Sequence, residues 1–285
     1  MSTFTFQQNP AKPYIIAGPC MAESWGLVDE VASFLKGLAS ELGFELIFKA
    51  SFDKANRTSI NNERGHGIQT TLDWFTKLKT TYGVKILTDI HETNQVAQVA
   101  EVVDVLQIPA FLCRQTDLLV EAVLSGKAVN IKKGQFLAPE AAQHIVAKAR
   151  KTAAGKPGLA CNIALTERGF SFGYGDLIVD MRSLPILAAN QTAVIFDITH
   201  SVQRPSIPSL GASGGDRKFT PSLARAAAAT GYLDGFFLEV HTDPNNAKSD
   251  KDVQLSFKQA EALLRQIIPM WQQAKKLTSI DSAFI

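Results

Sequence analysis

Eight short apolar runs, rich in β-branched residues, recur along the chain and constrain its fold more than any other feature. They cover residues 14–18, 45–50, 84–90, 103–110, 128–134, 162–169, 193–200 and 235–241. Between them lie segments with helical apolar spacing, as in Val28, Val31 and Leu35. Near-continuous apolar strands that alternate with amphipathic helices favour a parallel sheet covered by helices, and eight such units favour its closure. The chain is therefore predicted to be an α/β protein in which residues 1–285 form a single (β/α)8 TIM barrel.

An open, doubly wound sheet is the alternative architecture. Its usual nucleotide-binding signals are missing, because no Gly-x-Gly-x-x-Gly follows the first apolar run and no phosphate loop ending in Gly-Lys-Ser/Thr occurs. A length of 285 residues also suits one barrel, which typically needs about 250. The stretch from Ser201 to Arg217 is rich in Ser, Gly and Pro, so we predict an irregular, mobile flap after the seventh strand.

The charge balance excludes one class of partner. With 29 Lys and Arg against 27 Asp and Glu, the formal net charge is +2, too small for the basic footprint of a nucleic-acid-binding protein. Three widely spaced cysteines, Cys20, Cys113 and Cys161, fit reduced thiols better than a disulfide framework. No basic start precedes an apolar run, and no stretch of about 18 apolar residues occurs. We expect a cytoplasmic protein with no membrane or nucleic-acid partner.

Polar residues crowd the ends of the predicted strands, where the catalytic groups of such barrels lie. In chain order they are Cys20, Lys49, Asp89 with His91 and Glu92, Gln107, Lys132 with Lys133, Glu167 with Arg168, Asp197 with His200, and Glu239 with His241. Lys49, Lys132 and Arg168 around one barrel mouth would make a concave cationic site for phosphates and carboxylates. A Schiff-base role for Lys132 is a competing interpretation, since burial can make a lysine amine nucleophilic.

A second group of residues carries metal-binding chemistry. Its members come from the first, seventh and eighth strand ends and the loop that follows: Cys20, His200, Glu239 and Asp250. Thiolate, imidazole and carboxylate together suit Zn²⁺, Fe²⁺, Mn²⁺ or Co²⁺ and select none of them. The spacing alone also allows a purely structural interpretation, in which the cysteine is a core residue and the histidine is a hydrogen-bonded structural residue.

Seven ordered motifs resemble the 3-deoxy-D-manno-octulosonate 8-phosphate synthases. They are IAGPCMAES (16–24), FKASFDKANRTS (48–59), TDIHE (88–92), IPAFLCRQTDLL (108–119), NIKKGQFLAP (130–139), TERGFSFGY (166–174) and FDITHSVQRP (196–205). The resemblance implies a barrel enzyme that condenses phosphoenolpyruvate with D-arabinose 5-phosphate, in the supply of an acid sugar for lipopolysaccharide or a plant wall polysaccharide. Related shikimate-pathway synthases use erythrose 4-phosphate and usually carry Lys-Pro-Arg-Thr-Ser. Here Ala55 and Asn56 stand before Arg57, which favours the arabinose enzyme and leaves erythrose 4-phosphate as the alternative.

The same resemblance implies roles for individual residues. Phosphoenolpyruvate would be bound by Lys49, Lys54, Gln107, Ala110, Lys132 and Arg168, with His200, Lys132, Asp89 and Lys54 as the catalytic group. The sugar phosphate would be bound by Asn56, Arg57 and Ser59, and by Arg114 reaching into a neighbouring subunit of a homotetramer.

The first-strand motif Gly18-Pro19-Cys20 is similar to the metal-dependent branch of this family. That branch implies a divalent metal held by Cys20, His200, Glu239 and Asp250. The sequence around Asp250 departs from the Ser-Asp-Gly that is common in relatives, so Asp252 is an alternative ligand.

Several residues keep two interpretations. Asp89, His91 and Glu92 are either a proton relay or a hydrogen-bonded strand end. Cys113 and Cys161 are predicted to be core thiols and His144 a helix-surface residue, while His66 and His241 are candidate neighbours of the site. A catalytically silent barrel that binds a sugar phosphate is the alternative from outside enzymology, because a fold alone does not establish activity.

Overall fold

The computed structural model describes residues 4–209 and 212–277. Its central sheet is a closed barrel of parallel strands in the order β1-β12-β9-β6-β5-β4-β3-β2. These strands are β1 (Tyr14–Gly18), β2 (Glu45–Lys49), β3 (Lys85–Asp89), β4 (Val105–Ile108), β5 (Ala128–Lys132), β6 (Ile163–Glu167), β9 (Ala193–Asp197) and β12 (Gly235–Glu239). The predicted (β/α)8 TIM barrel is therefore confirmed, and the doubly wound alternative is wrong.

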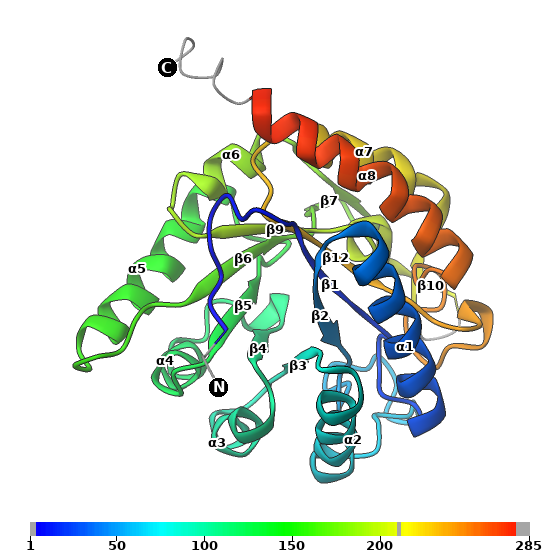
Figure 1. Ribbon diagram of the computed structural model, residues 1–285, viewed down its shortest axis with the longest axis horizontal. Helices are drawn as coiled ribbons and strands as arrows, with labels where there is room; N and C mark the ends of the chain where they lie inside the picture. The colour runs from blue at the N-terminus through cyan, green and yellow to red at the C-terminus, as the bar shows by residue number, and fades with distance from the viewer. Residues whose placement is uncertain (1–3, 210–211, 278–285) are drawn as a thin grey trace.

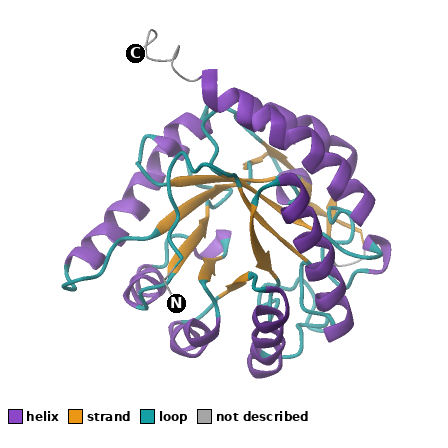
Figure 2. Cartoon of the chain, viewed as in Figure 1, coloured by secondary structure: helices purple, strands orange, loops and turns teal. Residues whose placement is uncertain are grey.

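Helices form the outer layer around this barrel (Figures 1 and 2). They are α1 (Trp25–Leu42), α2 (Ile68–Tyr82), α3 (Thr93–Val102), α4 (Thr116–Leu124), α5 (Ala142–Ala154), α6 (Ser183–Ala188), α7 (Thr220–Ala229) and α8 (Phe257–Leu277). Helix α1 shows why the local sequence folds this way. Ser24 caps its start by accepting a hydrogen bond from the Leu27 amide, and Gly43 ends it in the left-handed conformation that glycine favours. No described helix has both the length and the apolar character needed to span a bilayer.

Two apolar cores follow from the alternation of side chains along each strand. Outward residues such as Ile15 and Ala17 of β1 pack against the helices, whereas Tyr14 and Ile16 belong to a smaller cluster inside the barrel. Phe6 joins this inner cluster from the N-terminal segment. The apolar residues thus fill the end of the barrel where the strands begin, and the polar residues are left to the other end.

The stretch from 201 to 217 differs from its prediction as an irregular flap. It contains β10 (Gln203–Ser209) and β11 (Ala212–Gly215), which form an antiparallel ribbon; residues 210 and 211 lie outside the described chain. A second ribbon pairs β7 (Phe170–Phe172) with β8 (Asp176–Ile178). Pairing supplies the backbone hydrogen bonds that an irregular loop would leave to water. Proline and glycine obscured this signal because both are depleted in strands, although a two-stranded ribbon tolerates them at its edges.

We predict that Gly235→Ala destabilises the barrel. A methyl group at this position would lie 2.3 Å from the Tyr14 carbonyl oxygen of the neighbouring strand, so β1 and β12 would have to move apart. We expect a loss of about 1–3 kcal/mol in the free energy of unfolding, measured by chemical denaturation. Gly37→Ala is the matched control, because a methyl group there meets no atom within 4 Å on the exposed side of α1. It should stabilise by about 0.5–1 kcal/mol, and an equal loss in both variants would contradict the steric explanation.

Candidate active site

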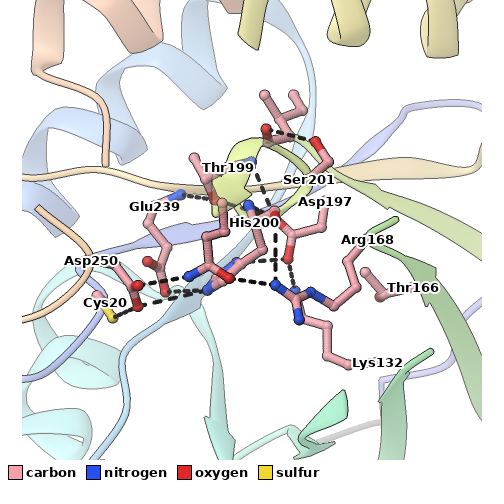
Figure 3. Close-up of polar contacts among 12 residues, drawn as sticks. Cys20, Lys132, Thr166, Arg168, Asp197, Thr199, His200, Ser201, Glu239 and Asp250 are labelled. Atoms are coloured by element: carbon pink, nitrogen blue, oxygen red, sulfur yellow. Dashed lines mark hydrogen bonds and ion pairs between the residues drawn. The ribbon is translucent and has the colours of Figure 1, made fainter. Parts of the chain in front are cut away.

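The carboxyl ends of β1 and β12 bring together residues that are far apart in the chain. Gly18 is paired with Glu239 in the parallel ladder, and Cys20 follows two residues later. Asp250 reaches the same point from the loop after β12 (Figure 3). One ligand atom from each of Cys20, Glu239 and Asp250 lies within 4.8 Å of the others. Asp250, not the alternative Asp252, therefore belongs to this cluster.

His200 completes the cluster from the turn after β9, in the short helix η3 (His200–Val202). Its Nε2 lies 3.7 Å from a Glu239 oxygen and 3.9 Å from an Asp250 oxygen. Its Nδ1 is 2.8 Å from Asp197, which also accepts the His200 backbone N–H at 2.8 Å. A carboxylate on Nδ1 fixes the ring and leaves Nε2 facing Glu239 and Asp250.

The donor set fits a divalent metal ion. Tetrahedral sites with thiolate, imidazole and carboxylate ligands hold neighbouring donor atoms roughly 3.5 Å apart. Cys20 Sγ lies 3.1 Å from Asp250 Oδ2, and the His200 separations are of the same order. Glu239 Oε2 is buried and has no hydrogen-bond partner in the described part of the chain, although its other oxygen is paired with Lys49 Nζ at 2.7 Å. Such an orphaned carboxylate oxygen is what a cation would satisfy.

The protonation states of these groups follow from burial and from their neighbours. Burial raises the pKa of the Cys20 thiol, and the negative charges of Glu239 and Asp250 raise it further. Asp250 behaves oppositely: burial disfavours its charge, yet His200 and Lys54 hold its pKa at about 2. Without a cation, the cysteine is therefore a thiol beside a carboxylate, and metal binding would release its proton.

Asp250 adopts an unusual backbone conformation. Its φ of +48° lies in the left-handed region that few residues other than glycine occupy. The backbone amides of Val253 and Gln254 both donate to its carbonyl oxygen, at 3.0 and 3.1 Å. This backbone conformation is less favourable than the usual ones, and it places the Asp250 carboxylate in the cluster.

Several cations lie beside the cluster of Cys20, His200, Glu239 and Asp250, which we call the metal-type cluster. Lys132, at the end of β5, forms an ion pair with Asp197 and lies 3.1 Å from the centre of the Phe237 ring. Burial lowers its pKa to about 8, against the opposing effect of Asp197. Burial also disfavours the charge of Lys54, but the carboxylates around it, Glu239 and Asp89 among them, raise its pKa above its usual value.

Arg168 is the cation that most clearly has a hydrogen-bond donor left for a ligand. It is 6% exposed, and its Nε has no hydrogen-bond partner within residues 4–209 and 212–277. Burial lowers its pKa, but a guanidinium remains charged at neutral pH. A buried charged donor without an acceptor indicates that an anionic ligand belongs at this position.

Asp89 is the start of a polar chain across the barrel interior. It accepts hydrogen bonds from Ser51 and from Gln107 Nε2, and Gln107 in turn accepts from Asn130, and Asn130 from Thr166. Burial disfavours its charge, but Lys49 and Lys54 hold its pKa well below the usual range. Asp89 thus matches the hydrogen-bonded strand end. The relay keeps no direct support, because His91 Nδ1 has no partner among the described residues.

One cavity of about 870 Å³ connects these groups. Most of the predicted residues line it, namely Lys49, Lys54, Asn56, Arg57, Asp89, Gln107, Ala110, Lys132, Arg168, His200, Glu239 and Asp250. Cys20 is buried beneath, whereas Ser59 and Arg114 do not line it. Arg57 is held at the rim by Ser249 Oγ at 3.1 Å and by the Lys248 carbonyl at 3.0 Å.

The remaining predicted residues lie outside the cavity. Cys113 is buried as predicted, Cys161 is only half-buried, and His144 is exposed on α5. His66 contacts the Glu23 carbonyl oxygen, and His241 Nε2 lies 3.7 Å from the Glu23 carboxylate.

Sequence reasoning missed two contributors, Ser51 and Gln203. Ser51 donates to Asp89 and accepts from Lys54. Gln203 accepts a hydrogen bond from Arg168. Neither side chain is charged, so the only signal was their position within the motifs at 48–59 and 196–205.

Lys133 has a structural role just behind the site. Its side chain is fully buried, donates to the carbonyls of Gly134 and Leu137, and lies 3.6 Å from Glu167. Glu167 Oε1 accepts the backbone N–H groups of Arg168 and Gly169. This pair therefore anchors the backbone from which the Arg168 guanidinium extends.

The comparisons with known proteins agree with this geometry. The chain matches the DAHP synthetase I family over residues 7–278, and it belongs to that family. Within it, the chain is 52% identical over 262 residues to the 2-dehydro-3-deoxyphosphooctonate aldolase of Bradyrhizobium sp. (strain BTAi1), covering 92% of this chain and 89% of the relative. It is 50% identical over 269 residues to the protein of the same name from Brucella abortus (strain S19), covering 94% of each. The resemblance inferred from the motifs is thereby confirmed.

We predict that Lys133→Met destabilises the chain by about 3–5 kcal/mol, because it leaves the Glu167 carboxylate buried without its cation. The free energy of unfolding from chemical denaturation measures this loss. Adding Glu167→Gln to Lys133→Met should recover much of the stability, since the uncompensated charge is removed. A double variant less stable than Lys133→Met would show that the pair is not electrostatically coupled.

Proposed function

We propose that this chain condenses phosphoenolpyruvate with D-arabinose 5-phosphate and water, giving 3-deoxy-D-manno-octulosonate 8-phosphate and phosphate. The observation that carries the proposal is one cavity whose wall holds the cations Lys54, Lys132 and Arg168 together with His200, Glu239 and Asp250, with Cys20 buried beneath it. The names of the relatives support the same product. They also count against a catalytically silent barrel, because those relatives are named as aldolases.

Phosphoenolpyruvate belongs with the cations deepest in the mouth. Arg168 offers its unpartnered Nε to an anionic oxygen, and Lys132 and Lys54 add charge from β5 and the β2 loop. Lys49 is already paired with Glu239 and with the Cys20 carbonyl oxygen, so it contributes mainly positive potential. Gln107 and Ala110 complete this part of the wall.

The sugar phosphate belongs nearer the rim. Asn56 and Arg57 line the cavity there, and the Ala55-Asn56 pair favours arabinose 5-phosphate over erythrose 4-phosphate. Ser59 lies beyond the wall in this arrangement. Arg114 is exposed and would serve the site of a neighbouring subunit, within a cytoplasmic homotetramer.

The reaction joins C3 of phosphoenolpyruvate to the aldehyde carbon of the sugar. Water adds at C2, and phosphate leaves with cleavage of its C–O bond, so the atoms of both substrates and the water appear in the two products. Cys20, His200, Glu239 and Asp250 would hold a divalent metal of unspecified identity. Lewis-acid polarisation of an oxygen, or a lower pKa of the attacking water, is the chemistry that such an ion supplies.

The residues of the chain hold two mutually repelling anions in reactive contact. Orientation of this kind can contribute roughly 7–11 kcal/mol toward a barrier. Lys132 acts here as a charged binding group: its ion pair with Asp197 and a pKa of about 8 keep most of the amine protonated at neutral pH. That state disfavours the Schiff-base interpretation, which needs the neutral amine.

The central experiment measures phosphate release from phosphoenolpyruvate with each sugar phosphate, with and without chelator, followed by metal add-back. We expect turnover with arabinose 5-phosphate that chelator removes and metal restores. Cys20→Ala should abolish that activity, since one ligand of the four is lost. Turnover that survives chelator would remove the metal from the proposal, and turnover only with erythrose 4-phosphate would replace the sugar.

A pH profile tests the role of Lys132. Because its pKa is about 8, the cation is present below that pH and is lost as the pH rises through it. We expect kcat/KM for phosphoenolpyruvate to fall above about pH 8, since this parameter reports the free enzyme. Lys132→Arg should lack this descending limb, because arginine stays charged over the whole range. The same fall in both proteins would assign the titration to another group.

A further inference from the structure

One glutamine connects the anion-binding side of the cavity with the metal-type cluster. Gln203, the first residue of β10, is 8% exposed. Its Oε1 accepts a hydrogen bond from Arg168 Nη2, and its Nε2 donates to Asp250 Oδ1 at 2.6 Å. The two partners fix the orientation of the amide, because a guanidinium only donates and a carboxylate only accepts.

Each partner of Gln203 has a second commitment in the site. The other oxygen of Asp250 lies 3.1 Å from Cys20 Sγ and 3.9 Å from His200 Nε2. Arg168 Nη2 also lies 3.3 Å from the His200 carbonyl oxygen, while its Nε has no partner among the residues that the structure describes. Gln203 therefore binds one oxygen of the Asp250 carboxylate, whose other oxygen faces Cys20 and His200, and one nitrogen of the Arg168 guanidinium, which lines the cavity.

We infer that Gln203 is a positioning residue that couples occupancy of the anion site at Arg168 to the affinity of the metal site at Asp250. The inference rests on the proposed function, because it takes phosphoenolpyruvate as the anion and a divalent cation as the ion. An anion that orders Arg168 also orders the amide, and the amide in turn holds Asp250 in the orientation that ligation needs. Binding at either the anion site or the metal site then reduces the conformational entropy that is lost when the other site is filled.

The structure offers a matched control in a second buried glutamine, Gln254. Its Oε1 accepts from the Cys20 backbone amide at 3.1 Å, and its Nε2 donates to the Ser249 carbonyl at 2.8 Å. Gln254 thus supports two parts of the same cluster. It differs in the decisive respect, because none of its described hydrogen bonds reaches Arg168.

The experiment uses the full chain, stripped of metal and titrated with Co²⁺, whose visible absorption changes when a thiolate binds it. The dissociation constant is measured with and without saturating phosphoenolpyruvate, and the ratio of the two values is the coupling factor. For the unchanged chain we expect phosphoenolpyruvate to tighten Co²⁺ binding within the roughly 5- to 150-fold range usual for coupled sites. In Gln203→Met, which keeps the shape but makes neither hydrogen bond, the factor should fall at least about threefold.

A second variant guards against general damage from the apolar substitution. Gln203→Asn keeps the amide but is one methylene shorter, so it cannot reach Arg168 and Asp250 at once, and it should lose the coupling to a similar extent. Gln254→Met should bind Co²⁺ more weakly with its coupling factor kept.

The outcomes separate this inference from the proposed function. An unchanged chain that binds neither Co²⁺ nor phosphoenolpyruvate would overturn both. Binding of both ligands with a factor that the Gln203 variants leave intact would overturn the coupling role alone. An equal loss of coupling in Gln254→Met would also overturn it, because loosening of the cluster would then explain the effect.

Discussion

A single buried carboxylate, that of Asp197, connects the two halves of the candidate site. It accepts from Lys132 on one side and from His200 Nδ1 on the other, and the backbone amides of Thr199 and His200 also donate to it. Burial alone would protonate this group, yet His200 and Lys132 hold its pKa well below the usual range. The charge on Asp197 therefore favours the protonated form of Lys132, which can bind an anionic ligand. It also orients the His200 imidazole toward the metal-type cluster.

The same principle applies to the other buried charges. Lys49 is paired with Glu239, and Lys133 with Glu167, so each of these two lysines at a strand end has an anionic neighbour in place. Pairing keeps the desolvation cost of these ions from becoming prohibitive and fixes their positions before a ligand arrives. Among the described residues, Arg168 Nε and Glu239 Oε2 have no hydrogen-bond partner. Arg168 Nε is therefore left to bind an anion, and Glu239 Oε2 to bind a cation.

Closure of the barrel explains why residues so distant in the chain can share one site. The parallel pairing of β1 with β12 sets Gly18 beside Glu239, and Gly18 also lies so close to β2 that a methyl group there would be 1.9 Å from the Lys49 carbonyl oxygen. This close approach places Cys20, Lys49 and Glu239 around one point. The ribbon after β9 then contributes Gln203 and Pro205 to the cavity wall, and Arg204 of β10 is paired to Asp176 of β8 at 2.9 Å.

The sequence by itself determined the strands, the helices and the residue types at the strand ends, because periodicity and polarity are local properties. The predicted strands begin within two residues of the observed ones, but several run past the true ends into the loops that carry Ala110, His200 and His241. Only the tertiary structure decided that Asp250 rather than Asp252 joins Cys20, that residues 203–209 and 212–215 form a ribbon, and that Gln203 lies between Arg168 and Asp250. Such choices depend on hydrogen bonds between segments brought together by barrel closure, and no spacing along a single segment records them.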